Sequence, residues 1–541
     1  MELPHGVALS AKPLARRSIL DVVMVAPVIA AAILFVGLAL LSLGWGIEHD
    51  VPYFCYLGFL VGHEHRMPYR DLFEVNLPGT FFIFMVLDKL IGPHDLGFRI
   101  ADVTLLGLLS GLTWKLLRPF GWMPALIGPT LFGLYYLHDS PMLSLQREFL
   151  ILQFLAPAIL LAADWKRSGT GWRAFWVGAS VGLATLIKPQ AILFLPALIV
   201  FLPAPVSRDA EPARPAETRR GHWLRILALG AVGSALPVLL AATWLAANGA
   251  LKEYAEIARR YYPLYSHLSG MHQTLRESER RGYLLREWFI AGGMHWWMIT
   301  AGLGVVLGFR GAPAPRRRLV WLLVALTAIS SILPPTSGQF YDYHWMPFFY
   351  FLAILSSLSL SRATPESPPF LRAVAAAVLV LVAVLHTQTR LPTAVKGQLA
   401  GLPYQRQLAG RVSAIDDYLR LHLQPGDTVQ PLDWTGGSAD ALWRARTPLA
   451  TRFMSDLYFY HHVSTPYIQS LRKRFIDELG RARPRVIVEI QTDKPWAGGH
   501  DTTREFPALQ RYIRENYVPD LIGDGFVIHL RREAPRDSTG G

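Results

Sequence analysis

The stretch from Trp45 to Phe84 reads WGIEHDVPYFCYLGFLVGHEHRMPYRDLFEVNLPGTFFIF. It holds most of the acidic and imidazole groups of the first hundred residues, and Glu48–Asp50 follow directly after a long apolar run, Ile19–Leu43. Ionisable groups that face lipid are costly. We therefore expect these groups to leave the membrane at its surface, where water and a polar substrate reach them. The stretch is our candidate active-site loop.

The composition around this loop is that of a polytopic membrane protein. The chain has 541 residues, of which 52% are apolar and 17% charged, and its apolar runs approach the roughly 20 residues that span a bilayer. The single cysteine, Cys55, excludes an internal disulfide and argues against a cysteine-ligated zinc site. Much of the net charge of +13 lies in short loops, where it sets orientation in the membrane. We therefore expect no nucleic-acid partner.

The apolar run from Leu77 to Gly92 decides the topology. As a helix it would measure roughly 24 Å, which is short for a hydrocarbon core of about 30 Å. If it spanned the membrane, the arginine-rich linker Ser207–His222 would lie outside, against the positive-inside rule. We therefore predict that Tyr53–Gly62 and Pro78–Gly92 are juxtamembrane helices on the outer surface.

This choice predicts eleven membrane spans and an extracytoplasmic carboxy terminus. The spans are 19–45, 99–117, 121–138, 148–163, 172–187, 189–203, 223–247, 288–309, 319–336, 345–361 and 371–388. Residues 1–388 would form the transmembrane catalytic domain, with the active-site loop at 46–98. The outer loop 248–287 conflicts with the charge rule because it is rich in arginine. Either it binds something anionic or its boundaries are different.

The composition changes after residue 388, and residues 389–541 are predicted to form an outer α/β domain. Three short runs have the pattern of strands: Asp427–Leu432, Arg485–Ile490 and Gly525–Leu530. Three longer segments have helical periodicity: Gln405–Leu423, Tyr467–Arg481 and Pro507–Tyr517.

The unusual polar side chains converge on one membrane face in this topology. The candidates for catalysis are Asp50 and His49, and those for donor-phosphate or substrate binding are Arg70, Asp71, Glu74, Asn76, Asp139, Arg147, Glu148, Lys188, Arg259, Arg260, Tyr341 and His344.

Several of these residues also have a purely structural interpretation. Asp50 is a favoured N-cap for a helix that starts near Pro52. Arg70 and Asp71 are placed to form a local ion pair. Lys188 differs, because it lies on the side where the charge rule disfavours cations, and this favours an anionic partner.

Five short motifs together resemble a known family. They are Met67–Asp71 (MPYRD), Asn76–Gly79 (NLPG), Gln146–Phe149 (QREF), Lys188–Gln190 (KPQ) and Tyr343–Pro347 (YHWMP), with an acid just after the first span. The pattern resembles the GT-C-fold glycosyltransferases that use lipid-linked sugars. It is most similar to the bacterial branch related to protein O-mannosyltransferases and to the aminoarabinose transferases of lipid A. The resemblance covers roughly residues 19–390.

The resemblance implies a function and a location. Asp50 would be the catalytic base, with His49 beside it. The enzyme would move a sugar, with inversion, from a polyprenyl-phosphate donor to a hydroxyl of a glycan, lipid or protein acceptor. The protein would lie in the bacterial inner membrane, in contact with membrane lipid, with its carboxy-terminal domain in the periplasm. Many family members carry Asp-Glu where this chain has Asp50-Val51. We expect no cofactor, with a divalent metal as the open alternative.

Two other classes of protein fit parts of the sequence. A transporter would also be polytopic, but it is expected to show repeat symmetry and polar residues in mid-span, which this sequence does not clearly have. A scaffold for cell-envelope glycan assembly would explain the outer domain, but not the acids and cations gathered on one face.

Overall fold

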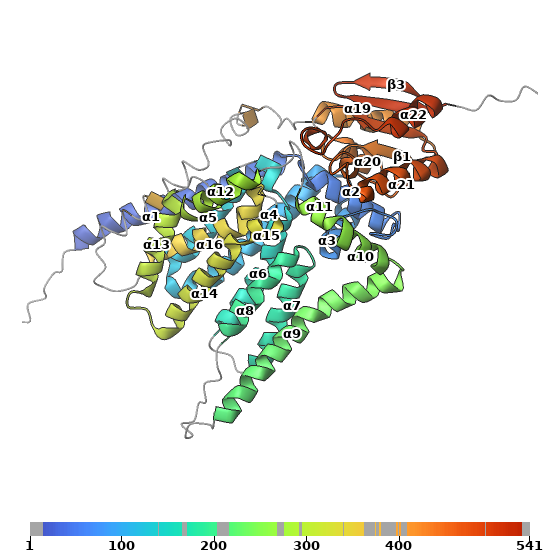
Figure 1. Ribbon diagram of the computed structural model, residues 1–541. Helices are drawn as coiled ribbons and strands as arrows, with labels where there is room; N and C mark the ends of the chain where they lie inside the picture. Colours follow the sequence, from blue (N-terminus) through green and yellow to red (C-terminus); the bar gives the residue numbers. More distant parts are fainter. Residues whose placement is uncertain are drawn as a thin grey trace, which may run out of the picture.

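The computed structural model shows a helical bundle with a small sheet at one end (Figure 1). It describes residues 14–138, 140–164, 170–202, 216–267, 275–290, 295–338, 340–361, 374, 378–379, 397–398, 400–401, 408–492 and 494–532. The predicted span 371–388 lies almost wholly outside these residues, as does Asp139.

Apolar helices form the bundle. They are α1 (Leu14–Leu41), α4 (Asp95–Leu117), α5 (Trp122–His138), α6 (Arg147–Ala163), α7 (Thr170–Thr185), α8 (Phe194–Val200), α9 (Ala216–Ala247), α13 (His295–Phe309), α14 (Ala314–Ser331) and α16 (Met346–Ser357), with the short α15 (Leu333–Ser337). Within the described residues, four segments are long and apolar enough to cross a membrane: Val25–Gly44, Asp95–Phe120, Arg220–Ala247 and Ala314–Ser337. The chain is a multi-pass helical protein, and the count of eleven spans stays a prediction.

Two parts of the predicted topology need correction. The segment 189–203 begins with a 3-10 helix, η4 (Pro189–Leu193), so that α8 is only one short piece. The predicted span 288–309 is divided between α12 (Glu277–Ile290) and α13. The preceding loop contains α10 (Leu251–Arg260) and α11 (Tyr262–Ser266). α10 is amphipathic, so its arginines belong to the polar face of a surface helix.

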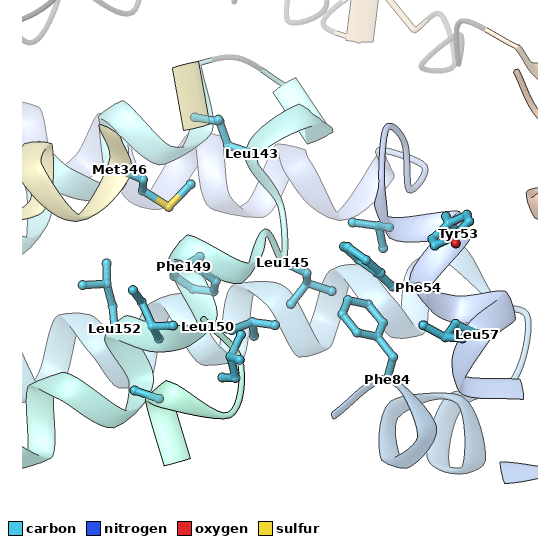
Figure 2. Close-up of a cluster of buried hydrophobic side chains, with 14 of the residues drawn as sticks. Tyr53, Phe54, Leu57, Phe84, Leu143, Leu145, Phe149, Leu150, Leu152 and Met346 are labelled. Atoms are coloured by element: carbon cyan, nitrogen blue, oxygen red, sulfur yellow. The ribbon is translucent and has the colours of Figure 1, made fainter. Parts of the chain in front are cut away.

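The candidate active-site loop folds into two helices that pack against each other. They are α2 (Val51–Gly62) and α3 (Pro78–Ile91). A Cβ placed at Gly58 would lie 2.5 Å from the Phe84 carbonyl carbon, so only glycine permits this approach of α2 to α3. Figure 2 shows Phe54 of α2 and Phe84 of α3 side by side near Leu145, with ring centroids 5.2 Å apart.

The carboxy-terminal region contacts the middle of α2 and the segment that follows this helix. The Tyr56 hydroxyl donates to the Thr447 carbonyl (2.9 Å), and the Arg66 guanidinium donates to the Leu449 carbonyl (2.8 Å). The backbone N–H of Phe73 donates to the Arg452 carbonyl (2.8 Å). Hydrogen bonds therefore connect the loop to the carboxy-terminal region at three separate points.

Asp88 on α3 makes a further, buried connection to the carboxy-terminal region. Its side chain is fully buried, and it accepts hydrogen bonds from Trp443 Nε1 (2.6 Å) and from Arg446 Nη1 (2.8 and 2.9 Å). His63 Nε2 lies 3.3 Å from its second oxygen. A buried carboxylate is tolerated only when it is paired and hydrogen-bonded, and here the carboxy-terminal region supplies most of the partners.

The sheet of the carboxy-terminal region has the order β1-β2-β4-β3. Its strands are β1 (Val429–Leu432), β2 (Val486–Ile490), β3 (Tyr517–Gly523) and β4 (Phe526–Arg531), accompanied by α19 (Ala409–His422), α20 (Ser438–Arg444), α21 (Pro466–Ala482) and α22 (Pro507–Asn516). β1 and β2 are parallel, and the other two pairs are antiparallel. The sequence did not predict β3, because Pro519 interrupts its pattern. Proline is tolerated here since β3 is an edge strand with an irregular register at Pro519.

Candidate active site

Asp50 stands at the N-cap position of α2 without acting as a cap. Its φ and ψ are −79° and −19°, and its carboxylate makes no hydrogen bond to the first turn of the helix. The interpretation of Asp50 as a simple helix cap is therefore wrong. The side chain is 11% exposed, and one of its oxygens lies 3.4 Å from His49 Nδ1. A buried carboxylate that is not used by its own helix is available for chemistry.

His49 connects the loop to two other helices. Its φ of +59° is in the left-handed region, which is uncommon for a residue with a side chain and is found at functional sites. Gln146, just before α6, has its side-chain nitrogen 3.3 Å from His49 Nδ1. The ring of Tyr343 meets the imidazole edge-on with centroids 5.7 Å apart. These contacts fix the imidazole beside Asp50, as expected for an orienting residue.

Two cations and an imidazole surround Asp50 and Glu148 on the bundle side. Glu148, in the first turn of α6, pairs with Lys188, and the same oxygen lies 3.4 Å from His344 Nε2. Arg147 donates to the side-chain oxygen of Asn76. The sequence placed these residues on one membrane face, and the structure brings them into one buried cluster.

A close approach between the backbones of Gly79 and Leu186 positions Lys188. The backbone N–H of Gly79 donates to the Leu186 carbonyl (2.8 Å), two residues before Lys188. A Cβ at Gly79 would lie 2.7 Å from that carbonyl oxygen, so the glycine of the NLPG motif allows α3 to begin there. The motif thus places the lysine next to the loop that carries Asp50.

The cluster keeps Asp50 ionised. Burial by itself raises the pKa of Asp50, but His49, Arg147 and His344 outweigh it and hold this pKa below the ordinary value of an aspartate. The side chain is therefore a carboxylate at neutral pH, as a general base must be.

Glu74 has a structural role in this geometry. One oxygen accepts from the backbone N–H groups of Val75 (2.7 Å) and Asn76 (2.9 Å) and from Asn76 Nδ2 (2.6 Å). The other accepts from the Tyr53 hydroxyl (2.7 Å), which lies 3.3 Å from the hydroxyl of Tyr458. With four donors on its two oxygens, Glu74 stabilises the loop and orients Asn76 toward Arg147.

Arg70 and Asp71 form the local ion pair that their adjacency suggested. Their closest atoms are 2.8 Å apart, Arg70 also donates to the Asn248 carbonyl (2.9 Å), and Asp71 accepts from the Met67 N–H (2.9 Å). The Arg70 side chain is 47% exposed. Neither residue lines the cavity at Asp50, and their substrate-binding role stays a prediction.

Arg259 and Arg260 lie at the exposed end of α10, outside the cluster. Arg260 covers the ring of Tyr467 at 4.4 Å, which is a cation–π contact with the carboxy-terminal region. Tyr341 is closer to the cluster. Its ring stacks on that of Tyr343 with centroids 5.6 Å apart, and both tyrosines line the cavity at Asp50.

The cavity at Asp50 is shared between the loop, the bundle and the carboxy-terminal region. It is lined by Asp50, Tyr53, Phe54, Glu74, Val75, Asn76, Arg147, Tyr265, Tyr341, Tyr343, Trp434, Leu457 and Tyr458. The sequence did not single out Trp434 or Tyr458, which lie about 400 residues further along the chain. The only signal in the sequence for either residue was the position of Trp434, shortly after the predicted strand that ends at Leu432.

The described residues bring no three His, Cys, Asp or Glu side chains into a group that could hold a metal ion. The expectation of no cofactor stays a prediction. The chemistry that these residues can perform themselves is removal of a proton by Asp50 and stabilisation of a nearby negative charge by Arg147, Lys188 and His344.

Comparison with known proteins shows the fold. Neither a protein-family model nor a curated protein sequence matches the chain. ArnT from Cupriavidus metallidurans bound to undecaprenyl phosphate has a similar structure, with a TM-score of 0.54 and 14% identity over 92% of this chain and 97% of that one. The apo state of ArnT gives a TM-score of 0.53 and 12% identity over the same shares. AglB from Archaeoglobus fulgidus, in complex with an inhibitory peptide and a dolichol-phosphate, has a TM-score of 0.45 at 10% identity over 86% of this chain and 69% of that one.

The chain has the GT-C fold, as its motifs indicated, and is a multi-pass membrane protein.

Proposed function

We propose that this protein is an inverting glycosyltransferase that moves a sugar from a polyprenyl-phosphate donor to an acceptor hydroxyl. One observation carries the proposal. A buried, ionised carboxylate, Asp50, shares a cavity wall with Arg147, next to the ammonium of Lys188 and the imidazole of His344. The ArnT structure that holds undecaprenyl phosphate has the same fold, which supports a lipid-phosphate donor.

The reaction would proceed in a single displacement. The acceptor oxygen attacks the anomeric carbon while its proton passes to the carboxylate of Asp50. The bond from the anomeric carbon to the phosphate oxygen breaks, and the polyprenyl phosphate leaves with the electron pair. Arg147, Lys188 and His344 stabilise the growing negative charge on that phosphate. One carboxylate suffices, because no glycosyl-enzyme intermediate forms.

We also propose that the site opens on the outer face of the bacterial inner membrane. The contacts of Tyr56, Arg66 and Asp88 hold α2 and α3 against the carboxy-terminal region. This geometry supports the prediction that both helices lie along the membrane surface, on the same side as that region.

The direct test incubates the purified full-length protein with a panel of polyprenyl-phosphate sugars and a mixture of glycan, lipid and peptide acceptors, and measures released polyprenyl phosphate. Release from at least one donor, dependent on Asp50, is the expected result. ArnT, treated identically with its own donor, is the control. If ArnT releases polyprenyl phosphate and this protein releases none from any donor in the panel, the proposal is wrong.

A further inference from the structure

A second cavity, of about 430 Å³, lies next to the cavity at Asp50. Its walls include the loop before α2, the segment between β1 and α20, and residues of α20 and of the segment between α5 and α6; among them are Glu48, His49, Met142, Trp434 and Asp440. We call it the outer cleft. Its volume falls in the range of about 300–1,000 Å³ that holds small-molecule ligands.

The outer cleft adjoins the reaction site. Tyr53 and Trp434 line both cavities. His49 lines the outer cleft and lies 3.4 Å from the carboxylate of Asp50. A group bound in the outer cleft would therefore reach the proposed base past Tyr53.

The loop that carries Trp434 is held in one conformation. Asp433 accepts from the backbone N–H groups of Gly436 (2.8 Å) and Ser438 (3.0 Å) and from the Ser438 hydroxyl (2.8 Å). Gly437 has a φ of +107°, which a side chain would strain. The indole of Trp434 also meets Trp496 at a centroid distance of 5.9 Å. A half-buried tryptophan fixed in this way is a ready-made flat apolar surface beside the cleft.

The remaining chemistry of the outer cleft suits hydroxyl groups rather than phosphate. Glu48 and Asp440 supply carboxylates, which accept hydrogen bonds from hydroxyl or amino groups. Asp440 is held by Arg444 Nε at 2.7 Å. No lysine or arginine is among the described residues that line this cleft, whereas the cavity at Asp50 contains Arg147. Negative charge is therefore disfavoured in the outer cleft.

We propose that the outer cleft binds the acceptor, and that this acceptor is a saccharide without phosphate, either neutral or carrying an amine. The apolar C–H face of a sugar ring would lie on Trp434, and its hydroxyl or amino groups would donate to Glu48 and Asp440. One of its hydroxyls would point past Tyr53 to Asp50. This inference rests on the proposed function, since it names the acceptor of that reaction.

Cysteine protection tests binding without turnover. Thr435→Cys places a thiol on the cleft wall, while the native Cys55 is fully buried and does not compete for reagent. Millimolar methyl hexosides or glucosamine should slow maleimide labelling of Thr435→Cys at least threefold, whereas glucose 6-phosphate should not. Glu515→Cys, on the exposed face of α22, is the control and should label at one rate throughout.

Three outcomes would overturn the acceptor proposal. These are labelling that no saccharide slows, labelling that glucose 6-phosphate slows as strongly as glucosamine, and labelling that only a serine-containing peptide slows. The last outcome would assign the cleft to a protein acceptor.

A second measurement separates this proposal from the proposed function. With any donor that the panel identifies, Trp434→Ala should raise the acceptor KM at least tenfold and the donor KM less than threefold, and Trp434→Phe should recover most of the loss. If the wild type cleaves no donor, the proposed function fails. If it cleaves donor and Trp434→Ala keeps the wild-type acceptor KM, only the cleft proposal fails.

Discussion

Replacement of Asp50 by asparagine tests the proposed base most directly. Asparagine keeps the size of the side chain but does not take a proton from a hydroxyl at neutral pH. General-base catalysis contributes about 10²–10⁴-fold, which corresponds to about 2.7–5.4 kcal/mol of transition-state stabilisation. Asp50→Asn should therefore lose at least about 100-fold in transfer rate while it folds and inserts normally.

The structure also fixes what Asp50→Ala should do. A lost N-cap costs about 1 kcal/mol, but Asp50 makes no capping hydrogen bond. Both variants lose the same interactions of the carboxylate with His49 and Arg147. Neither variant therefore loses a helix cap, and their transfer rates should be equally low.

The assay measures transfer of a labelled sugar at saturating donor, with thermal unfolding in detergent measured in parallel. Asp524→Asn, in the exposed turn between β3 and β4, is the matched control and should behave as the wild type. Near-wild-type transfer by Asp50→Asn would refute the role of Asp50. Glu74 would be a poor replacement, because its oxygens already accept four hydrogen bonds. Glu48, on the wall of the outer cleft, would be the next candidate.

The remaining predictions concern pH, donor binding and topology. Because the lowered pKa of Asp50 keeps the carboxylate charged, the acid limb of kcat/KM should lie below the ordinary pKa of an aspartate. His49→Gln removes a cause of that lowering and should move the limb to higher pH, and a pH profile with an unmoved limb would contradict this. Lys188→Met leaves Glu148 buried without its ammonium partner and should cost about 3–5 kcal/mol of stability in thermal unfolding. Lys188→Met with Glu148→Gln should restore most of that stability yet raise the donor KM about tenfold or more, and a wild-type KM in the double variant would make Lys188 purely structural. In intact bacterial cells, Glu515→Cys should react with a membrane-impermeant maleimide, and reaction only after the inner membrane is broken would invert the proposed topology.

Local patterns in the sequence predicted most of the helices. The run 99–117 became α4 and 148–163 became α6 because each has enough apolar residues to specify a helix by itself. The failures lie where the tertiary structure overrides local pattern. The strand β3 contains Pro519 and exists because β4 pairs with it.

The candidate site likewise contains residues that the sequence pattern predicted and residues that only the tertiary structure brings together. The positive-inside rule placed Lys188 and Glu148 on one face, and the structure joins them directly. The rule describes a membrane side and carries no distances, so it did not separate this pair from Arg70 and Asp71, which form a surface ion pair. Trp434 was missed because nothing local connects it to Asp50, and only the docking of the carboxy-terminal region brings the two together.

The burial of Asp88 has a consequence for how this chain can be divided. A chain truncated before residue 389 would lose Trp443 and Arg446 and leave the carboxylate with His63 as its remaining described ion-pair partner. In a chimaera that still buries Asp88, loss of the partners of this charge would cost several kcal/mol, a large share of the stability of a typical domain. The bundle and the carboxy-terminal region are therefore interdependent, and a chimaera that exchanges that region must retain a tryptophan and an arginine at positions 443 and 446.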